Sequence, residues 1–153
     1  MESDYMHPES IVAYGALVPM TVYFDDLDAF GMLHNRHYGL LAERAWAAYW
    51  QRQEVSLEEG ATLRDDAFIV VKEISITFEA PILRPGEYGV HLWIDRLGRT
   101  SLTHGFRVCS ADGEQTYARG SRVIVRIDPK TLRPTEWSEA ARQLGRQLIR
   151  PEQ

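Results

Sequence analysis

The chain has 153 residues, which is enough for one domain and too few for two of ordinary size. Its hydrophobic fraction of 44% is typical of a globular protein with a buried core, and it excludes disorder over most of the chain. The net charge of −5 lacks the basic footprint of most nucleic-acid-binding proteins, so we expect no nucleic-acid partner.

The cysteine content and the N-terminus bear on the cellular compartment. Cys109 is the single cysteine, so no disulfide can form within the chain, and its place in an alternating apolar run predicts a buried structural thiol. Residues 1–7 lack the basic region and apolar core of a signal peptide. No apolar run reaches the length of a membrane span. We therefore expect a cytoplasmic protein without a membrane partner.

In chain order, we expect one domain over residues 1–153 that begins with a loose arm over residues 1–16. Val18–Phe24 is rich in β-branched and aromatic residues, which predicts the first strand. A loop over residues 25–36 follows it. Gly31 lies within this loop and can adopt backbone conformations that other residues avoid.

From about residue 36 the apolar period becomes helical. One predicted helix face carries Tyr38, Leu41, Ala42, Ala45, Ala48 and Tyr49, with Trp46 on its flank. Leu40 and Trp50 lie on the opposite face beside charged residues. A helix that is apolar around so much of its circumference is expected to be wrapped by other structure.

The rest of the chain alternates in the manner of half-buried strands. Strands are predicted over residues 67–78, 88–97, 100–110 and 115–127. Short turns between them predict an antiparallel meander, so the fold class is α+β, with one helix covering a five-stranded sheet. Ser138 is a suitable N-cap for a C-terminal helix over residues 138–150.

The chemistry concentrates between the first strand and the helix. Residues 25–28 contain three carboxylates, Gly31 follows, and a His-Asn-Arg-His cluster over residues 34–37 precedes the helix. Unpaired N–H groups and the positive end of the helix dipole favour developing negative charge at such a position. A carboxylate beside an oxyanion site is a workable arrangement for acyl transfer.

The same residues carry a family resemblance. The motif reads Asp26-Leu27-Asp28-Ala29-Phe30-Gly31-Met32-Leu33-His34-Asn35-Arg36-His37-Tyr38, followed by Glu43-Arg44-Ala45. It resembles the signature of hotdog-fold acyl-CoA thioesterases of the hydroxybenzoyl-CoA thioesterase-like group, and in outline the likeness extends over residues 18–137. The resemblance implies a hotdog fold, in which a curved five-stranded antiparallel sheet wraps around a long central helix.

The resemblance also implies an activity. A thioesterase of this group hydrolyses an acyl-CoA or acyl carrier protein thioester to a carboxylic acid and a thiol. It is expected to act as a homodimer or homotetramer with sites at the subunit interface, and to use no cofactor. His34 and His37 stand near acids, but the family uses no metal and no other ligand spacing supports one.

Three residues are predicted to be catalytic. Asp28 falls on the position of the family's catalytic aspartate, as either nucleophile or general base. Asn35 falls where the family has histidine or asparagine, and its backbone N–H near the helix start would donate to the thioester oxygen. Asn35 is also a candidate helix-capping residue, and the two roles are compatible. His34 is a secondary candidate, because it lies in the same passage.

Three further residues are predicted to bind substrate: Tyr38, Phe24 and Gly31. Tyr38 matches a family tyrosine at the helix start, with its ring in the core. Phe24 replaces a tyrosine of some relatives, Met32 replaces their histidine or valine, and Phe30 is bulky. These departures bear on the identity of the substrate more than on the reaction.

Six arginines lie in the predicted strands and turns: Arg96, Arg99, Arg107, Arg119, Arg122 and Arg126. Some are candidates for binding the phosphates of coenzyme A, and most are expected to be solvated.

Two other functions fit the same fold. A hotdog dehydratase would pair a histidine with an acid on the helix, whereas here the acid precedes the helix. A non-catalytic acyl-binding or assembly module would leave Asp28 without a chemical role.

Overall fold

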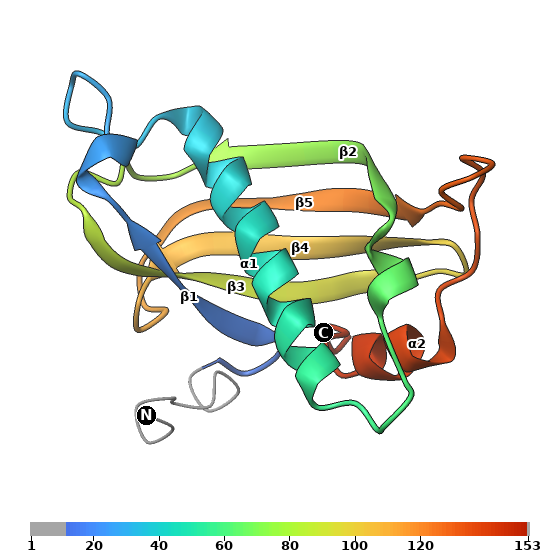
Figure 1. Ribbon diagram of the computed structural model, residues 1–153. Helices are drawn as coiled ribbons and strands as arrows, with labels where there is room; N and C mark the ends of the chain where they lie inside the picture. The colour runs from blue at the N-terminus through green and yellow to red at the C-terminus, as the bar shows by residue number, and fades with distance from the viewer. Residues whose placement is uncertain (1–11, 153) are drawn as a thin grey trace.

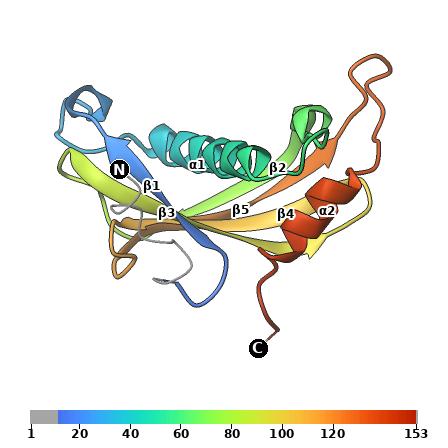
Figure 2. The same cartoon turned by 60° about the horizontal axis from the view of Figure 1, so that its bottom comes forward.

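The computed structural model describes residues 12–152. A five-stranded antiparallel sheet curves around one long helix, α1 (Figures 1 and 2). In chain order the elements are β1 (Ala16–Val22), η3 (Phe24–Asp26), α1 (Asn35–Val55), η4 (Arg64–Ala67), β2 (Ile69–Phe78), β3 (Gly86–Leu97), β4 (Ser101–Ser110), β5 (Thr116–Arg126) and α2 (Glu139–Arg146). This arrangement confirms the predicted α+β hotdog fold.

The sheet order is β1-β3-β4-β5-β2, so the predicted meander is correct for β3, β4 and β5 but wrong for β2. β2 pairs with β5 instead of β3. The connection between β2 and β3 carries Pro81 and Pro85, so it makes no tight hairpin turn. The N–H groups of Glu79 and Ala80 donate to the Tyr117 carbonyl, and from there the chain crosses to β3. As a result β2 lies at one edge of the sheet.

Helix α1 packs against the concave face of the sheet (Figure 2). Its buried side chains are Tyr38, Leu41, Ala42, Ala45, Trp46 and Tyr49, which confirms the predicted face. Ala42 and Ala45 are fully buried and have only a methyl side chain, which lets the helix backbone approach the strands closely. The N-terminus of α1 is thereby fixed at one end of the sheet, and its second half lies toward η4 and α2.

The core lies between α1 and the central strands. The largest fully buried side chain is that of Phe106 on β4. Cys109 is buried as predicted, and its thiol donates to the Gly89 carbonyl at 3.5 Å. Within residues 12–152 there is no helix both long enough and apolar enough to cross a membrane.

The second helix begins where Ser138 predicted and ends earlier than expected. The Ser138 hydroxyl accepts a bond from the Ala141 N–H at 3.1 Å. The helix stops at Arg146 because the residues after it pair with β3, where the Ile94 N–H donates to the Leu148 carbonyl at 2.8 Å. The first strand begins at Ala16, and most of the predicted N-terminal arm lies outside the described residues.

Replacement of Phe106 by alanine tests the core. Because this ring has 0% exposure, Phe106→Ala should lower the free energy of unfolding by about 3–5 kcal/mol, from lost transfer energy and the cavity left behind. Phe30→Ala is the matched control, since Phe30 is 85% exposed and its loss should change stability by at most about 0.5 kcal/mol. Urea unfolding measures both, and equal effects would contradict this assignment of the core.

Candidate active site

The residues between η3 and α1 form a small loop that closes on itself. Leu27 and Leu33 pair in an antiparallel bridge. Between them the Asp28 N–H donates to the Met32 carbonyl at 2.8 Å, and the Gly31 N–H donates to the Asp28 carbonyl at 3.0 Å. Gly31 has φ +78°, a conformation that favours glycine. The two ends of the loop are therefore held together, and Asp28 is fixed close in the chain to the start of α1.

The carboxylate of Asp28 is oriented by its own loop. Its Oδ1 accepts from the N–H groups of Phe30 at 2.9 Å and Met32 at 3.2 Å. No donor to Oδ2 is found in the described part of the chain. The side chain is half-buried, so water can reach it. One oxygen is therefore positioned and the other is available for chemistry.

The start of α1 brings His34 and Asn35 next to this loop. His34 is the N-cap residue, and its Nδ1 accepts from the Arg36 N–H at 3.1 Å. Asn35 is the first residue of the helix and not its N-cap. The side-chain cap, which an asparagine could supply, comes from the preceding residue, His34. Among residues 12–152 the Asn35 N–H meets no acceptor, as is usual in the first turn of a helix.

The three predicted substrate-binding residues differ in position. Tyr38 is buried, and its hydroxyl accepts from the Ile82 N–H at 3.0 Å. Burial raises the pKa of Tyr38 above its ordinary value. Its ring meets Phe78 edge-on, with centroids 5.3 Å apart. Phe24 and Gly31 are exposed instead. The structure therefore brings Phe24 and Gly31 to the surface and places Tyr38 in the core.

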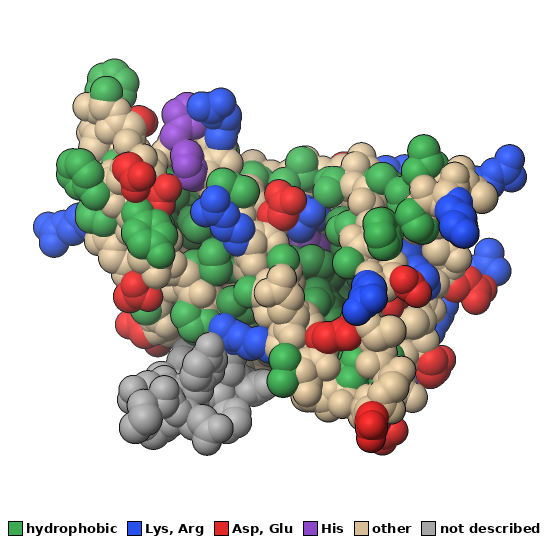
Figure 3. Space-filling view, in the orientation of Figure 1, with side chains coloured by type: hydrophobic (Ala, Val, Ile, Leu, Met, Phe, Trp, Pro, Cys, Tyr) green, Lys and Arg blue, Asp and Glu red, His purple; other side chains and the backbone are tan. Residues whose placement is uncertain are grey.

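Exposed apolar side chains surround the Asp28 loop. Phe24 is 81% exposed and Phe30 85%, and Tyr23 and Leu83 are exposed as well. Hydrophobic side chains gather at this end of the molecule together with acidic ones (Figure 3). From the sequence, Phe30 was notable only as a bulky departure from the motif. Exposed apolar groups around a carboxylate are typical of a binding surface.

His37 faces an acid but forms no metal site with it. Its Nε2 lies 3.9 Å from Asp26 Oδ1. Asp26 also accepts from the Tyr23 N–H at 2.8 Å through Oδ2, which closes η3. Across residues 12–152 no three side chains of the types that bind metals converge.

A second polar cluster lies beneath α1, and no pattern in the sequence indicated it. Arg122 is only 3% exposed, although most of the six arginines were expected to be solvated. Its Nη1 lies 3.3 Å from His104 Nε2, and the His104 ring stacks on Trp46 with centroids 4.0 Å apart. Burial, together with the neighbouring Arg122 charge, lowers the pKa of His104 to about 3. His104 is therefore neutral at physiological pH.

A family model decides the identity of the chain. The model of the thioesterase-like superfamily matches residues 22–144, which includes the Asp28 loop and α1. The chain belongs to this superfamily. The family expected from the motif is thus confirmed, and so is the enzyme class, a thioesterase.

Individual relatives agree with the family match. The acyl-CoA thioester hydrolase YbgC of Escherichia coli O6:H1 is 26% identical over 117 residues, which cover 76% of this chain and 84% of YbgC. A thioesterase from Thermus thermophilus, solved with coenzyme A and zinc, is 28% identical with a TM-score of 0.71, over 91% of this chain and 98% of that one. The PA5185 protein of Pseudomonas aeruginosa PAO1 shares the fold, with a TM-score of 0.76 at 21% identity, over 92% and 95% of the chains.

The buried histidine predicts a dependence of stability on pH. The unfolded chain protonates His104 near pH 6.5 and the folded chain only near pH 3, so unfolding takes up a proton between these values. The free energy of unfolding should therefore fall as the pH drops below 6.5, by about 2 kcal/mol at pH 5 for this group. Burial lowers the pKa of His91 to about 4, so His91 adds a second contribution in the same direction.

His104→Phe separates the two histidines. Phenylalanine retains a ring against Trp46 but does not titrate, so the variant should lose less stability than wild type between pH 7.5 and pH 5. Urea unfolding at the two pH values measures the loss. Equal losses in wild type and variant would show that His104 does not contribute.

Proposed function

We propose that this thioesterase hydrolyses acyl-CoA thioesters, with Asp28 as the residue that carries the reaction. The observation that supports this most directly is the Asp28 carboxylate, which has one oxygen held by two backbone N–H groups and the other free, just before the N-terminus of α1. Coenzyme A is favoured as the thiol carrier because YbgC is named for acyl-CoA thioesters and the Thermus relative binds coenzyme A.

The proposed chemistry uses a water molecule and the free oxygen of Asp28. Oδ2 takes a proton from the water while the water oxygen attacks the thioester carbonyl carbon. The carbonyl oxygen becomes an oxyanion, and the Asn35 N–H at the start of α1 donates to it. The intermediate then collapses, the carbon–sulfur bond breaks, and the leaving thiolate takes the proton from Asp28. The products are a carboxylic acid and free coenzyme A.

The remaining residues have supporting roles in this proposal. His34 accepts a bond from Arg36, so we assign it to positioning the first turn of α1 rather than to proton transfer. Phe24 and the exposed backbone around Gly31 would contact the substrate near the thioester. Tyr38 would act indirectly, because its hydroxyl accepts the Ile82 N–H and so holds the backbone at that residue.

Asp28→Asn tests the mechanism. The amide oxygen can still accept the Phe30 and Met32 N–H bonds, so the loop should keep its shape while the base is lost. The rate of thiol release from a panel of acyl-CoAs should fall by about 10²–10⁴-fold. Asp25→Asn is the matched control, because Asp25 is an exposed acid three positions away, and it should retain wild-type activity.

Other outcomes would change the proposal. Full activity in Asp28→Asn would contradict this role for the aspartate. If the protein hydrolysed only acyl carrier protein thioesters, the thiol carrier of its substrate would be the carrier protein and not coenzyme A. A single turnover in ¹⁸O-labelled water should leave the Asp28 carboxylate unlabelled, whereas label in Asp28 would identify it as the nucleophile.

The same proposal includes a homodimer, alone or as half of a homotetramer. β2 is an edge strand, and side chains on both of its faces are half-exposed and apolar, among them Val70 and Ile74. A long apolar edge without proline is a template for pairing with another chain. Pairing of two β2 strands by a two-fold axis would cover these side chains and leave no open edge on that side.

Ile74→Lys tests this assembly. A lysine on each β2 strand would put charges into the shared edge, so the mass in solution should fall by half, which for a dimer is a fall to the single-chain value of 17.6 kDa. Val55→Lys is the control, since Val55 is also an exposed apolar residue, at 87% against 48% for Ile74, but lies at the end of α1. Light scattering after size exclusion measures the mass. A wild type that runs as one chain would contradict the dimer.

A further inference from the structure

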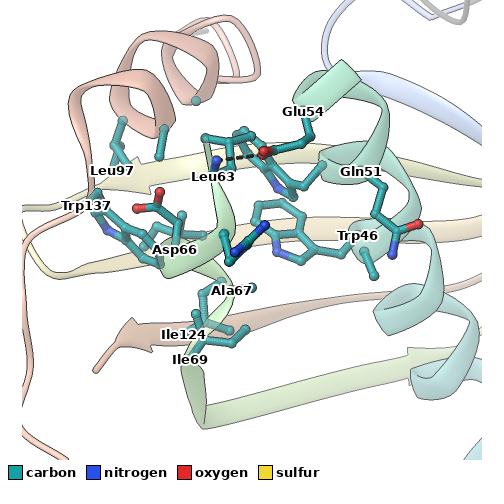
Figure 4. Close-up of a pocket in the computed structure, with 16 residues that line it drawn as sticks. Trp46, Gln51, Glu54, Leu63, Asp66, Ala67, Ile69, Leu97, Ile124 and Trp137 are labelled. Carbon is teal, nitrogen blue, oxygen red and sulfur yellow. Dashed lines mark hydrogen bonds between the residues drawn. The ribbon is translucent and has the colours of Figure 1, made fainter. Parts of the chain in front are cut away.

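A large cavity lies at the other end of α1 from Asp28. Its volume is about 470 Å³, in the size range of small-molecule sites. The second half of α1, η4, α2 and the ends of the central strands enclose it (Figure 4). Figure 3 shows its opening as a hollow beside α1 with hydrophobic side chains at the floor. An apolar hollow of this size that opens to the surface is typical of a ligand-binding site.

The walls of the cavity are mainly apolar. Three of the four tryptophans of the chain line it: Trp46, Trp50 and Trp137. Ile69, Leu97, Leu102 and Ile124 are among the other apolar residues of the wall. Such a surface favours hydrocarbon, and each methylene group buried there contributes about 0.8 kcal/mol.

The charged residues of the wall select against an anionic occupant. They are Glu54, Asp66 and Arg64, and Arg64 is exposed, so its charge can remain in solvent. Glu54 accepts a backbone N–H at 2.6 Å. Asp66 accepts from the Ser138 hydroxyl at 2.7 Å and lies 3.5 Å from the Arg126 guanidinium. A carboxylate inside the cavity would therefore meet two carboxylates whose partners are already engaged, which is unfavourable in a poorly solvated site.

An apolar strip joins the Asp28 end of the molecule to the cavity. The side chains of β2 that face α1 are Phe78, Ile76, Ile74, Val71 and Ile69, as their pairing with the helix-facing residues of β5 shows. The strip begins at Phe78, beside Tyr38 in the first turn of α1. It ends at Ile69, which is part of the cavity wall. Between these ends Val71 and Ile74 remain half-exposed.

We propose that the cavity receives the far end of the acyl group, so that the substrate is a long-chain, uncharged acyl thioester. This inference rests on the proposed function at Asp28. Trp46 lies roughly 16 Å along the helix axis from Asn35, at about 1.5 Å per residue. An extended chain advances roughly 1.2 Å per bond, so an acyl chain of about 13 bonds reaches the cavity. Shorter acyl groups would end on the strip.

The proposed dimer does not account for the cavity. Pairing through β2 covers the strip and would close its open side over a bound chain. The cavity itself is lined mainly by α1, η4, α2 and the central strands of a single chain, and β2 contributes only its first residue, Ile69, to the wall. Its volume and its tryptophan lining therefore call for an occupant other than a second copy.

The kinetic test fills the cavity and measures chain-length preference. Ala47 and Ala67 both line the cavity and are exposed, so a larger side chain fits at either position. Ala47→Phe and Ala67→Phe should each lower kcat/KM for myristoyl-CoA by at least about tenfold, the loss of two buried methylene groups, and leave butyryl-CoA unaffected. Ala111→Phe, in the exposed turn after β4, is the control and should behave as wild type.

A comparison of two substrates of equal length tests whether the cavity selects against a charged acyl chain. Tetradecanedioyl-CoA has the length of myristoyl-CoA but carries a second carboxylate at the far end. Wild type should hydrolyse it at least about tenfold less efficiently, because Glu54 and Asp66 line the cavity. Equal rates for the two substrates would overturn the assignment of the cavity to uncharged chains.

A binding measurement keeps this inference separate from the proposed function. S-tetradecyl-coenzyme A is a thioether that no thioesterase hydrolyses, and its chain should change the fluorescence of the three cavity tryptophans, whereas S-methyl-coenzyme A should not. The response should weaken in Ala47→Phe. Such binding without any thioester hydrolysis would refute the proposed function and leave the cavity assignment standing.

Two kinetic results would overturn the inference while the proposed function stands. One is Asp28-dependent hydrolysis with equal efficiency for butyryl-CoA and myristoyl-CoA in wild type. The other is a chain-length preference that neither cavity-filling variant changes, which would make the cavity a separate ligand site. Absence of any fluorescence response to the S-tetradecyl compound would also overturn it.

Discussion

The packing of α1 on the concave face of the sheet is the interaction on which the other features depend. Ala42 and Ala45 bring the helix close to the strands, and no larger side chain intervenes at these positions. This close approach fixes the N-terminus of α1 beside the Asp28 loop and directs its second half over the ends of the central strands. The proposed oxyanion donor and the cavity are thus placed by one rigid element, as precise chemistry requires.

The Asp28 loop achieves its geometry with backbone bonds instead of side-chain partners. Two N–H groups hold one carboxylate oxygen, and the Leu27–Leu33 bridge holds the ends of the loop. The surrounding side chains are therefore free to vary without loss of the carboxylate's orientation. This explains how bulky residues such as Phe30 and Met32 occupy the motif and remain at the surface, where they bear on substrate contact.

The motif around Asp28 and the buried face of α1 were predictable, because each depends on residues close together in the sequence. The pairing of β2 with β5 was not, since turn residues between two strands do not specify which strand becomes the neighbour. Arg122 looked solvated because burial of a guanidinium depends on residues distant in the sequence, here His104, whose ring stacks on Trp46 of α1. The cavity joins residues from 46 to 145, and no local pattern marks it.

The two edges of the sheet differ in a way that bears on assembly. β1 carries Pro19, which cannot donate a ladder hydrogen bond and is exposed in the middle of the strand. β2 has no proline and presents apolar side chains on both faces. Pairing at both edges would extend the sheet without limit, whereas one blocked and one open edge favours a closed pair. The same difference makes the open edge the side on which a partner would cover the apolar strip beside α1, so assembly and substrate binding would depend on the same strand.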